Sequence, residues 1–474
     1  MKNNFTSFLS DFGSRVALFD TSANRSITFK ELDDRSSFLI GELFEREFVF
    51  LVAGWTIDCI AFYLGCLKKK IVVALLPSSI SASKIVELIR DFNPSYIFCD
   101  EKTADKELLD YVALYNSKSR ILKTQNNLIN EELALLLPTS GSRSKPKFVR
   151  ISYSNLLTNT DSICSNLNLR DNGKSITTLP MSYSYGLSVL NTHLFVGAQI
   201  VLSDKSVINR EFWELVEFHK VTNLNGVPST YQLINRVAKN QFLASSLKEI
   251  TQAGGAMDAP TLHELVRNCD DADIRLYKMY GQTEATARIS ILPPEELLDS
   301  VMSVGYAVKG GTVSLVDDEG REIGEPFNEG EIKYFGGNVA LGYAQKAEDL
   351  ALGDLNHGTL HTGDHGYFDA KGRLYINGRK DRIIKVDGIR LDLDEIERNF
   401  KKHNIEAIIV NIGNQLGVFS ERTSWTKKRK NFVLNDMSVS PSRINFIVLN
   451  KFPRLDSGKM DFVKLQEELQ SRTI

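Results

Sequence analysis

Short apolar runs alternate with longer amphipathic runs along most of the chain, and this alternation restricts the possible folds more than any other feature. Strands that are apolar on both faces need cover on both faces, which favours parallel sheets flanked by helices. The pattern therefore predicts an α/β fold. The expected strands are 48–54, 71–76, 96–99, 175–179, 199–203, 223–226, 249–253 and 275–279, and the expected helices include 57–67, 83–92, 210–219 and 229–239.

The residue pattern changes in the last third of the chain. Glycines become dense between 305 and 388, which predicts a small antiparallel β region with tight turns. A charged stretch and a short α+β pattern follow. A chain of 474 residues is too long for one core, so we expect a large N-terminal domain over 1–380 and a small, shortened C-terminal lid domain over 381–474.

Composition excludes some classes of protein and leaves others open. The formal net charge is −2, so overall charge gives no sign of a nucleic-acid partner. The segment 379–474 holds 19 Lys and Arg against 13 Asp and Glu, which indicates either an anionic ligand near it or an incidental surface imbalance.

The apolar runs also bear on location. The most apolar runs are far shorter than the roughly 20 residues that cross a bilayer, so no membrane span is expected. The five cysteines are odd in number and form no CxxC pair, and the first residues lack a signal-peptide pattern. A cytoplasmic protein with reduced thiols is expected.

A polar loop follows the apolar run 133–137. Its hydroxyls, backbone N–H groups and lysines could bind phosphate oxygens, although GxxxxGK[ST] is absent and a flexible linker would look the same. The candidate residues are Thr139, Ser140, Gly141, Ser142 and Lys147.

A second motif follows the expected strand 275–279. Tyr280 offers an aromatic face to a base, Thr283 offers a hydroxyl to phosphate, and Glu284 offers a carboxylate oxygen to Mg²⁺. Open α/β sheets bind ligands at the carboxyl ends of their strands, where this motif would lie. A helix-capping threonine would account for part of the pattern equally well.

Asp364 and Arg379 lie in turn-rich segments and could hold the two hydroxyls of a ribose. A metal site is the competing interpretation, because His357, His361 and His365 recur every four residues. The interspersed glycines argue against the helix that such a site would need.

Taken in order, these motifs resemble those of the adenylate-forming superfamily, which contains acyl-CoA synthetases, peptide-synthetase adenylation domains and luciferase. The resemblance runs from about 28 to 465. Besides the segments above, the matching motifs are Ala253-Gly254-Gly255-Ala256, Tyr280-Gly281-Gln282-Thr283-Glu284, Gly330-Glu331-Ile332, Gly342-Tyr343, Thr362-Gly363-Asp364, the segment 378–391 and Ser457-Gly458-Lys459. Any one match is weak, whereas the ordered set is specific.

The resemblance implies an activity, cofactors and partners. It implies ATP-dependent activation of a small carboxylic acid as acyl-AMP with release of pyrophosphate, followed by transfer of the acyl group to the thiol of CoA or of pantetheine on an acyl carrier protein. ATP and Mg²⁺ are the implied cofactors.

The resemblance also implies residue roles. Tyr280 would stack on adenine, Thr283 would hold the α-phosphate, Glu284 would bind Mg²⁺, and Asp364 with Arg379 would hold the ribose. Lys459 would bridge the carboxylate and the phosphate. The remaining implied residues are Gly254, Gly255, Ala256, Gly281 and Gln282 for the nucleotide, Tyr183, Ser184 and Gly186 for the acyl pocket, Asp381 for the hinge, and Lys385 and Gly388 for the loop used in the thiol step.

The sequence departs from the family pattern at several points. Arg143 and Ser144 replace the usual Thr-Gly of the phosphate loop, and Phe148 replaces a glycine. Ser184 stands where adenylation domains for α-amino acids generally carry aspartate, so the expected substrate lacks a free α-amine. Two alternatives stay open at this point: an amino-acid adenylation enzyme, and an inactive nucleotide-binding relative.

Overall fold

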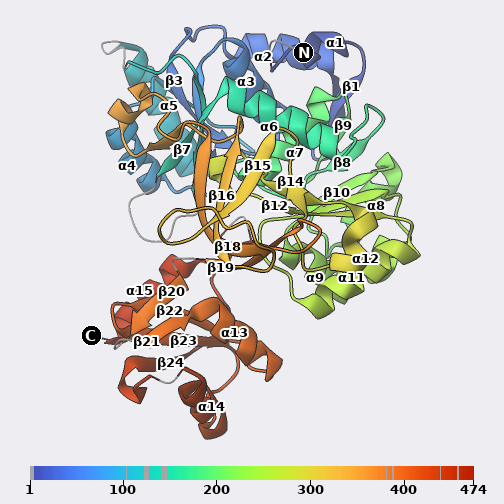
Figure 1. Ribbon diagram of the computed structural model, residues 1–474. Coiled ribbons are helices and arrows are strands. Elements are labelled where there is room, and N and C mark those ends of the chain that lie inside the picture. Colours follow the sequence, from blue (N-terminus) through green and yellow to red (C-terminus); the bar gives the residue numbers. More distant parts are fainter. Residues whose placement is uncertain are drawn as a thin grey trace. The chain divides into compact units, whose positions relative to one another are not determined.

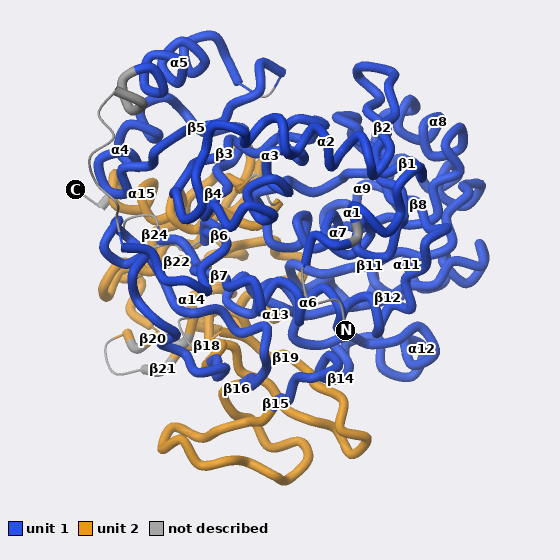
Figure 2. Tube along the Cα trace, turned by 90° about the horizontal axis from the view of Figure 1, so that it is seen from above, with its two compact units in different colours: residues 1–139, 145–313, 334–360 blue, residues 140–144, 314–333, 361–474 orange. Residues whose placement is uncertain are grey.

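The computed structural model describes residues 5–102, 104–121, 128–139, 147–379, 382–386, 389–437, 439–455 and 458–473. These residues divide into two compact units, coloured separately in Figure 2. Unit 1 comprises Met1–Thr139, Lys145–Val313 and Tyr334–Leu360, and unit 2 comprises Ser140–Ser144, Ser314–Lys333 and His361–Ile474. The division that the sequence predicts at 380/381 stays a prediction.

Unit 1 contains a nine-stranded sheet in the order β14-β13-β12-β11-β10-β8-β9-β1-β2 (Figure 1). The strands from β12 to β1 run parallel, and the edge strands β2, β13 and β14 are antiparallel to their neighbours. Their bounds are β1 Val16–Asp20, β2 Arg25–Thr28, β8 Lys174–Ile176, β9 Gln199–Leu202, β10 Asn223–Gly226, β11 Glu249–Gln252, β12 Arg275–Tyr280, β13 Ser290–Leu292 and β14 Tyr306–Ala307.

The second sheet of unit 1 has the order β17-β7-β6-β4-β3-β5. Its parallel core, β6-β4-β3-β5, confirms the expectation from unbroken apolar runs, and β3 is buried along its whole length. The bounds are β3 Phe48–Ala53, β4 Val72–Pro77, β5 Tyr96–Phe98, β6 Leu133–Pro138, β7 Phe148–Ser152 and β17 Gly342–Ala344.

Helices connect the strands of unit 1 and cover its sheets. Several begin at hydroxyl caps, as at Thr28, Thr56 and Ser152, where a side-chain oxygen accepts a backbone N–H that the helix leaves unpaired. The helices are α1 Phe8–Asp11, α2 Phe29–Leu39, α3 Ile57–Lys68, α4 Ala82–Phe92, α5 Lys106–Ile121, α6 Tyr153–Asn166, α7 Ser184–Phe195, α8 Arg210–His219, α9 Pro228–Val237, α10 Lys239–Leu243, α11 Ala259–Asp271 and α12 Leu297–Ser300, with 3₁₀ turns at Thr283–Ala285, Pro294–Glu296 and Ala347–Ala351.

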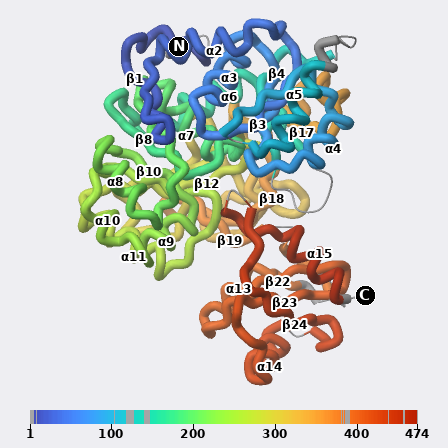
Figure 3. Tube along the Cα trace, turned by 180° about the vertical axis from the view of Figure 1, so that it is seen from behind, coloured from blue at the N-terminus to red at the C-terminus, as the bar shows by residue number. Residues whose placement is uncertain are grey.

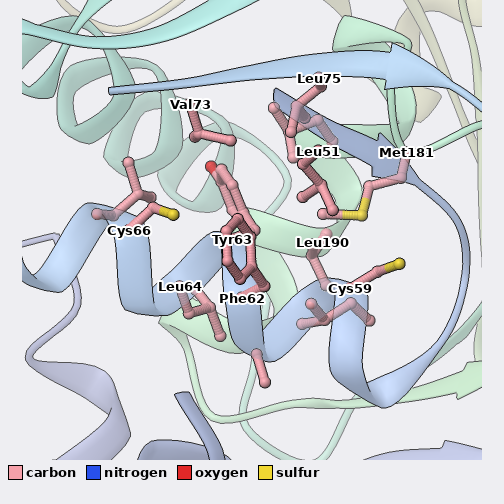
Figure 4. Close-up of a cluster of buried hydrophobic side chains, with 14 of the residues drawn as sticks. Leu51, Cys59, Phe62, Tyr63, Leu64, Cys66, Val73, Leu75, Met181 and Leu190 are labelled. Carbon is pink, nitrogen blue, oxygen red and sulfur yellow. The ribbon is translucent and has the colours of Figure 1, made fainter. Parts of the chain in front are cut away.

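The largest core of unit 1 joins residues of both sheets through α3 and α7. In Figure 4 the Tyr63 ring of α3 lies among Leu51 and Val73 of the second sheet and Leu190 of α7. In α3, Ile57 and the nine consecutive residues from Cys59 to Leu67 are buried, and Asp58 is partly exposed. Such a helix is apolar nearly all round because it packs against other elements on most of its surface.

All five cysteines are thiols rather than disulfides, as the sequence predicts. Burial raises the pKa of Cys59 to about 11 and that of Cys269 to about 12. The pKa of Cys66, on the same helix as Cys59 (Figure 4), is raised well above its usual value for the same reason. These thiols are therefore protonated at neutral pH.

His193 of α7 is fully buried, and burial lowers its pKa to about 4. In the unfolded chain the same imidazole takes up a proton near pH 6.5. The free energy of unfolding therefore falls as pH is lowered from 6.5 towards 4, because only the unfolded state gains the proton. We expect His193→Gln to remove up to about 3 kcal/mol of this acid destabilisation. Urea unfolding of both proteins at pH 7 and pH 4.5 measures it, and an equal loss of stability in both proteins on acidification would contradict the assignment.

Unit 2 contains a three-stranded sheet, β22-β23-β24, and a two-stranded ribbon, β20-β21. The helices α13 and α15 pack on β22 (Figure 3). This is the small α+β arrangement expected for the C-terminal part. The bounds are β20 Ile383–Val386, β21 Ile389–Asp392, α13 Leu393–Lys402, β22 Ile408–Ile412, β23 Gln415–Glu421, α14 Lys427–Met437, a 3₁₀ turn at Pro441–Arg443, β24 Ile444–Leu449 and α15 Phe462–Thr473.

The glycine-rich region forms a four-stranded sheet in the order β15-β16-β18-β19, and the division between the units falls inside three of its strands. These strands confirm the small β region expected from the dense glycines. The bounds are β15 Gly311–Val316, β16 Gly330–Gly336, β18 Thr359–Phe368 and β19 Leu374–Arg379.

The competing metal interpretation fails on this geometry. His361 and His365 lie on the strand β18, and His357 has a left-handed φ of 49°, so the three histidines do not share a helix. Within the described ranges, no group of three His, Cys, Asp or Glu side chains is placed to hold a metal ion. In those ranges no helix has the length and hydropathy to cross a bilayer.

Candidate active site

The Tyr280–Glu284 motif begins at the carboxyl end of β12, where the sequence predicts it. Gly281 is required there, because a Cβ at this position would lie 1.8 Å from the carbonyl oxygen of Ala287. The chain then forms the 3₁₀ turn Thr283–Ala285, and Tyr280 is largely buried. The motif thus closes back on itself within eight residues, which fixes the position of Thr283 and Glu284.

A buried asparagine, which sequence reasoning missed, holds this turn. The Asn338 amide donates to the carbonyl oxygens of Ala285 and Arg288, at 2.8 Å each, and Thr286 Oγ1 donates to the Asn338 carbonyl at 2.7 Å. Two consecutive residues of the turn have positive φ, Thr286 at 53° and Ala287 at 126°. Strained conformations of this kind persist only where neighbours enforce them. The dense glycines of this region predict tight turns near Asn338 but give the asparagine no role.

The nucleotide motif touches the candidate acyl pocket. Thr283 Oγ1 and Ser184 Oγ are 3.1 Å apart, so the hydroxyl expected at the α-phosphate lies against a residue expected at the acyl group. Ser184 is the first residue of α7, and its N-cap Tyr183 supplies no side-chain cap. Uncapped N–H groups at a helix start can bind an anion.

The two other pocket residues differ in what they contact. Gly186 packs closely against the main chain of Pro180, because a Cβ at position 186 would lie 2.2 Å from the Pro180 carbonyl oxygen. Gly186 also lines a cavity of about 10 Å³, which has room for at most one water. Tyr183 lies against Gly254, where a Cβ would meet the Tyr183 hydroxyl at 2.6 Å.

The Ala253–Ala256 segment follows β11 and therefore lies next to the carboxyl end of β12. Gly254 has a φ of 86°, which disfavours any side chain, and Gln252 donates from Nε2 to the Gly255 carbonyl at 3.1 Å. Gly255 and Ala256 are exposed. The structure thus brings this loop to the same sheet edge as Tyr280.

Tyr343 connects the expected metal ligand to the expected phosphate-loop lysine. Its hydroxyl donates to Glu284 Oε1 at 2.8 Å, and the Lys147 ammonium lies 3.8 Å from the centre of its ring. The ring face attracts the ammonium, and the hydroxyl orients the carboxylate. The Gly-Tyr motif was noted in the sequence, but this bridging contact was not foreseen. Thr139 closes the base of the loop by donating from its backbone N–H to the Lys147 carbonyl at 3.1 Å.

Asp364 and Arg379, the two residues expected at the ribose, form a pair in unit 2. They stand opposite each other on β18 and β19, with Arg379 Nε 3.3 Å from Asp364 Oδ1. Thr362 Oγ1 accepts the backbone N–H of Asp364 at 3.1 Å and donates to the Ile332 carbonyl. The Asp364 side chain is 9% exposed and that of Arg379 is 55% exposed, so the pair has a buried carboxylate and a guanidinium that reaches solvent.

Lys459 lies in a tight turn of unit 2. Gly458 has a φ of 79° and donates to the Leu455 carbonyl at 2.8 Å, and Leu455 donates to the Lys459 carbonyl at 2.9 Å. The Arg454 side chain donates to the Gly458 carbonyl at 2.9 Å. The main chain around Lys459 is therefore held on both sides.

Several predicted residues lie outside the described residues. These are Ser140, Gly141 and Ser142 of the phosphate loop, the expected hinge Asp381, and Gly388 of the thiol-step loop. For Lys385 the backbone is described as part of β20, and its side chain is not.

The chain is similar to known proteins in sequence and in fold. The model of the "AMP-binding enzyme" family matches residues 5–344. The 2-succinylbenzoate–CoA ligase of Bacillus cereus (strain AH820) is 28% identical over 333 residues, which cover 68% of this chain and 66% of that protein. The ligase of the same name from Bacillus pumilus is 28% identical over 287 residues, 60% of this chain and 57% of that protein. The match thus spans less than two thirds of the length of each of these curated relatives.

Solved structures resemble the whole fold. ATP-bound MatB from Rhodopseudomonas palustris gives a TM-score of 0.78 at 20% identity and covers 99% of both chains. The o-succinylbenzoate CoA synthetase (MenE) of Bacillus subtilis, in complex with its acyl-adenylate intermediate OSB-AMP, gives 0.77 at 20% identity and covers 98% of both chains. Since the family model matches well over half of the sequence, the chain belongs to the AMP-binding enzyme family, the adenylate-forming superfamily that its motifs resemble.

Proposed function

We propose that this protein is an ATP-dependent, AMP-forming ligase that joins a small carboxylic acid to a thiol. The observation that supports the proposal is the contact between Thr283 and Ser184, because one of these residues is expected at the nucleotide and the other at the acyl group. Catalysis of a reaction between two anions depends on such positioning. The curated relatives named above join 2-succinylbenzoate to CoA, which supports the same class of reaction.

The chemistry has two steps. In the first, a carboxylate oxygen of the acid attacks the α-phosphorus of ATP, the bond to the β-phosphate oxygen breaks, and acyl-AMP and pyrophosphate result. In the second, the thiol sulfur attacks the acyl carbon, the bond to the AMP oxygen breaks, and the thiol loses its proton. The products are a thioester and AMP.

The residues of unit 1 have definite tasks in the first step. Thr283 donates its hydroxyl to an α-phosphate oxygen, and Tyr280 presents its ring to the adenine. Lys147 offers positive charge to the outer phosphates, where charge develops as pyrophosphate departs. The Asp364–Arg379 pair of unit 2 is suited to two neighbouring hydroxyls, because it offers an acceptor beside a donor.

Glu284 fits a magnesium ion. Its carboxylate has one oxygen bonded to Tyr343, which orients the group, and hard carboxylate oxygens are the ligands that Mg²⁺ prefers. When bound, Mg²⁺ would offset the charge of the triphosphate. A MenE structure from Bacillus subtilis contains ATP and magnesium.

The acceptor thiol belongs to CoA or to pantetheine on an acyl carrier protein. A MenE variant from Bacillus subtilis has been solved with the product analogue OSB-NCoA, which favours CoA. The proposed location is the cytoplasm, which keeps thiols such as the five found here reduced.

Exchange of radiolabelled pyrophosphate into ATP, dependent on an added acid, tests the proposal. We expect exchange with des-amino acids to exceed exchange with the matching amino acids. Glu284→Gln is expected to reduce exchange by about 100-fold, as removal of one charge-stabilising group does elsewhere. Glu264→Gln on the surface of α11 is the control. Absence of exchange with every acid would favour an inactive relative, and preference for amino acids would favour the amino-acid adenylation alternative.

A further inference from the structure

Arg288 is a buried cation whose charge is not balanced within the described part of the chain. It follows the strained turn of the nucleotide motif and is 2% exposed. Its side-chain contacts are long: 3.5 Å to the Ala287 carbonyl and 3.3 Å to Ser188 Oγ. Nε has no hydrogen-bond partner, and no carboxylate of the described residues forms an ion pair with the guanidinium. Burial accordingly lowers the pKa of Arg288.

Arg150, a second buried arginine of unit 1, has hydrogen-bond partners that Arg288 lacks. It is also wholly buried, but its guanidinium donates to the carbonyl oxygens of Leu341, Tyr343, Leu352 and Gly353. Each nitrogen of Arg150 therefore has a backbone acceptor. The contrast means that burial alone does not explain the poor pairing of Arg288.

The surroundings of Arg288 do not supply the missing charge. The guanidinium carbon lies 4.7 Å from the centre of the Tyr185 ring, and Tyr183 and Tyr185 are the groups that favour its charged form. Burial raises the pKa of both phenols, to about 12 for Tyr183 and still higher for Tyr185, so they stay neutral. Attraction to a ring offsets only part of the cost of removing a guanidinium from water.

Arg288 lies close to the expected site of adenylation. Its neighbour Ser188 lies one helical turn after Ser184, and Ser184 touches Thr283 at the expected site of adenylation. Residues four apart on a helix lie on one face, about 6 Å along the axis. A short acid whose reacting carboxylate lies at Thr283 could therefore place a second group near the guanidinium.

We propose that Arg288 is a specificity-determining residue that binds a second anionic group of the substrate, so that the preferred acids are short dicarboxylic acids. The inference rests on the proposed function and names its substrate class. A carboxylate paired with the guanidinium makes charge-assisted hydrogen bonds and removes the buried imbalance. Neutral acids of the same length leave the charge unpaired and bind less well.

Pyrophosphate exchange with succinate and glutarate, each against its monomethyl ester, tests this. For the unaltered protein we expect kcat/KM for the diacid to exceed that for the ester by about 100-fold, the factor typical of a lost buried charge pair. Arg288→Met should abolish this preference, mainly by raising KM for the diacid. Arg288→Lys should retain part of it. Arg275→Met is the control, because this arginine sits at the opposite end of β12, half exposed and paired with Glu249.

Thermal stability separates a binding role from a structural one. Replacing an unpaired buried charge by an apolar side chain should leave the Tm unchanged or raise it. An unchanged diacid preference in Arg288→Met, with or without a lower Tm, would overturn the inference and assign Arg288 to the fold.

Binding keeps the two proposals distinguishable. In the presence of AMP, the diacids but not their esters should raise the Tm of the unaltered protein, and Arg288→Met should lose the shift. This shift without any exchange would reject the proposed ligase while supporting the role of Arg288. Exchange with monocarboxylic acids and no preference for diacids would support the proposed ligase and reject the role of Arg288.

Discussion

Replacement of Arg150 by methionine is expected to destabilise unit 1 by about 3–5 kcal/mol, because it leaves several buried carbonyl oxygens without a donor. Arg150 is 0% exposed, and its partners lie on β17, at the residue before β17 and on the segment that follows the turn at Ala347–Ala351. The side chain thus ties β7 to a part of the chain about 200 residues away in sequence. Methionine matches much of the volume but offers no N–H group.

Tryptophan fluorescence during urea unfolding measures this effect. Trp55 and Trp213 lie in unit 1 and Trp425 lies in unit 2, so a Trp425→Phe background makes the signal specific to unit 1. Arg275→Met again serves as the control, because loss of its partly exposed ion pair should change the free energy of unfolding by at most about 1 kcal/mol. Similar small changes in both variants would show that the carbonyls find other donors.

Replacement of Lys459 by alanine is expected to reduce acyl-AMP formation by about 100- to 1000-fold and to leave thiol transfer from supplied acyl-AMP nearly unchanged. The physical reason is charge: carboxylate and phosphate repel each other in the first step only, and the ammonium relieves that repulsion. The turn at Gly458 holds the main chain of Lys459 firmly, which suits a side chain with a positioning task.

Two assays separate the half-reactions of this variant. Pyrophosphate exchange reports adenylation, and single-turnover thioester formation from synthetic acyl-AMP reports transfer. Lys464→Ala on α15 is the matched control, since its ammonium is largely exposed and 3.9 Å from Asp461. If both half-reactions of Lys459→Ala fall together, the residue has another role.

The sheets could be predicted from the sequence because burial on both faces leaves a local signature. The expected strands 48–54, 71–76 and 96–99 appear as β3, β4 and β5 within one or two residues at each end. The strand expected at 175–179 is shorter in the structure, where β8 ends at Ile176 and α7 begins at Ser184. The order of strands was not predictable, since pairing depends on contacts distant in sequence.

In the candidate site, too, some features have a local sequence signature and others depend on contacts distant in sequence. The position of the Tyr280–Glu284 motif at the end of a strand could be predicted from local sequence. Asn338, Tyr343 and Arg150 owe their roles to partners 50 or more residues away, and nothing adjacent to them indicates these partners. Arg288 is a further case, because its burial and the lack of a carboxylate partner among the described residues are seen only in the structure.

The buried thiols have a consequence for an enzyme of this chemistry. Acyl-AMP and thioesters are electrophiles that react with thiolates, so any accessible, ionised cysteine would capture the activated acyl group. The high pKa values of Cys59, Cys66 and Cys269 keep these sulfurs protonated as well as enclosed. The proposed acyl donor could therefore be held without acylation of these cysteines, which leaves the proposed external thiol as the acceptor.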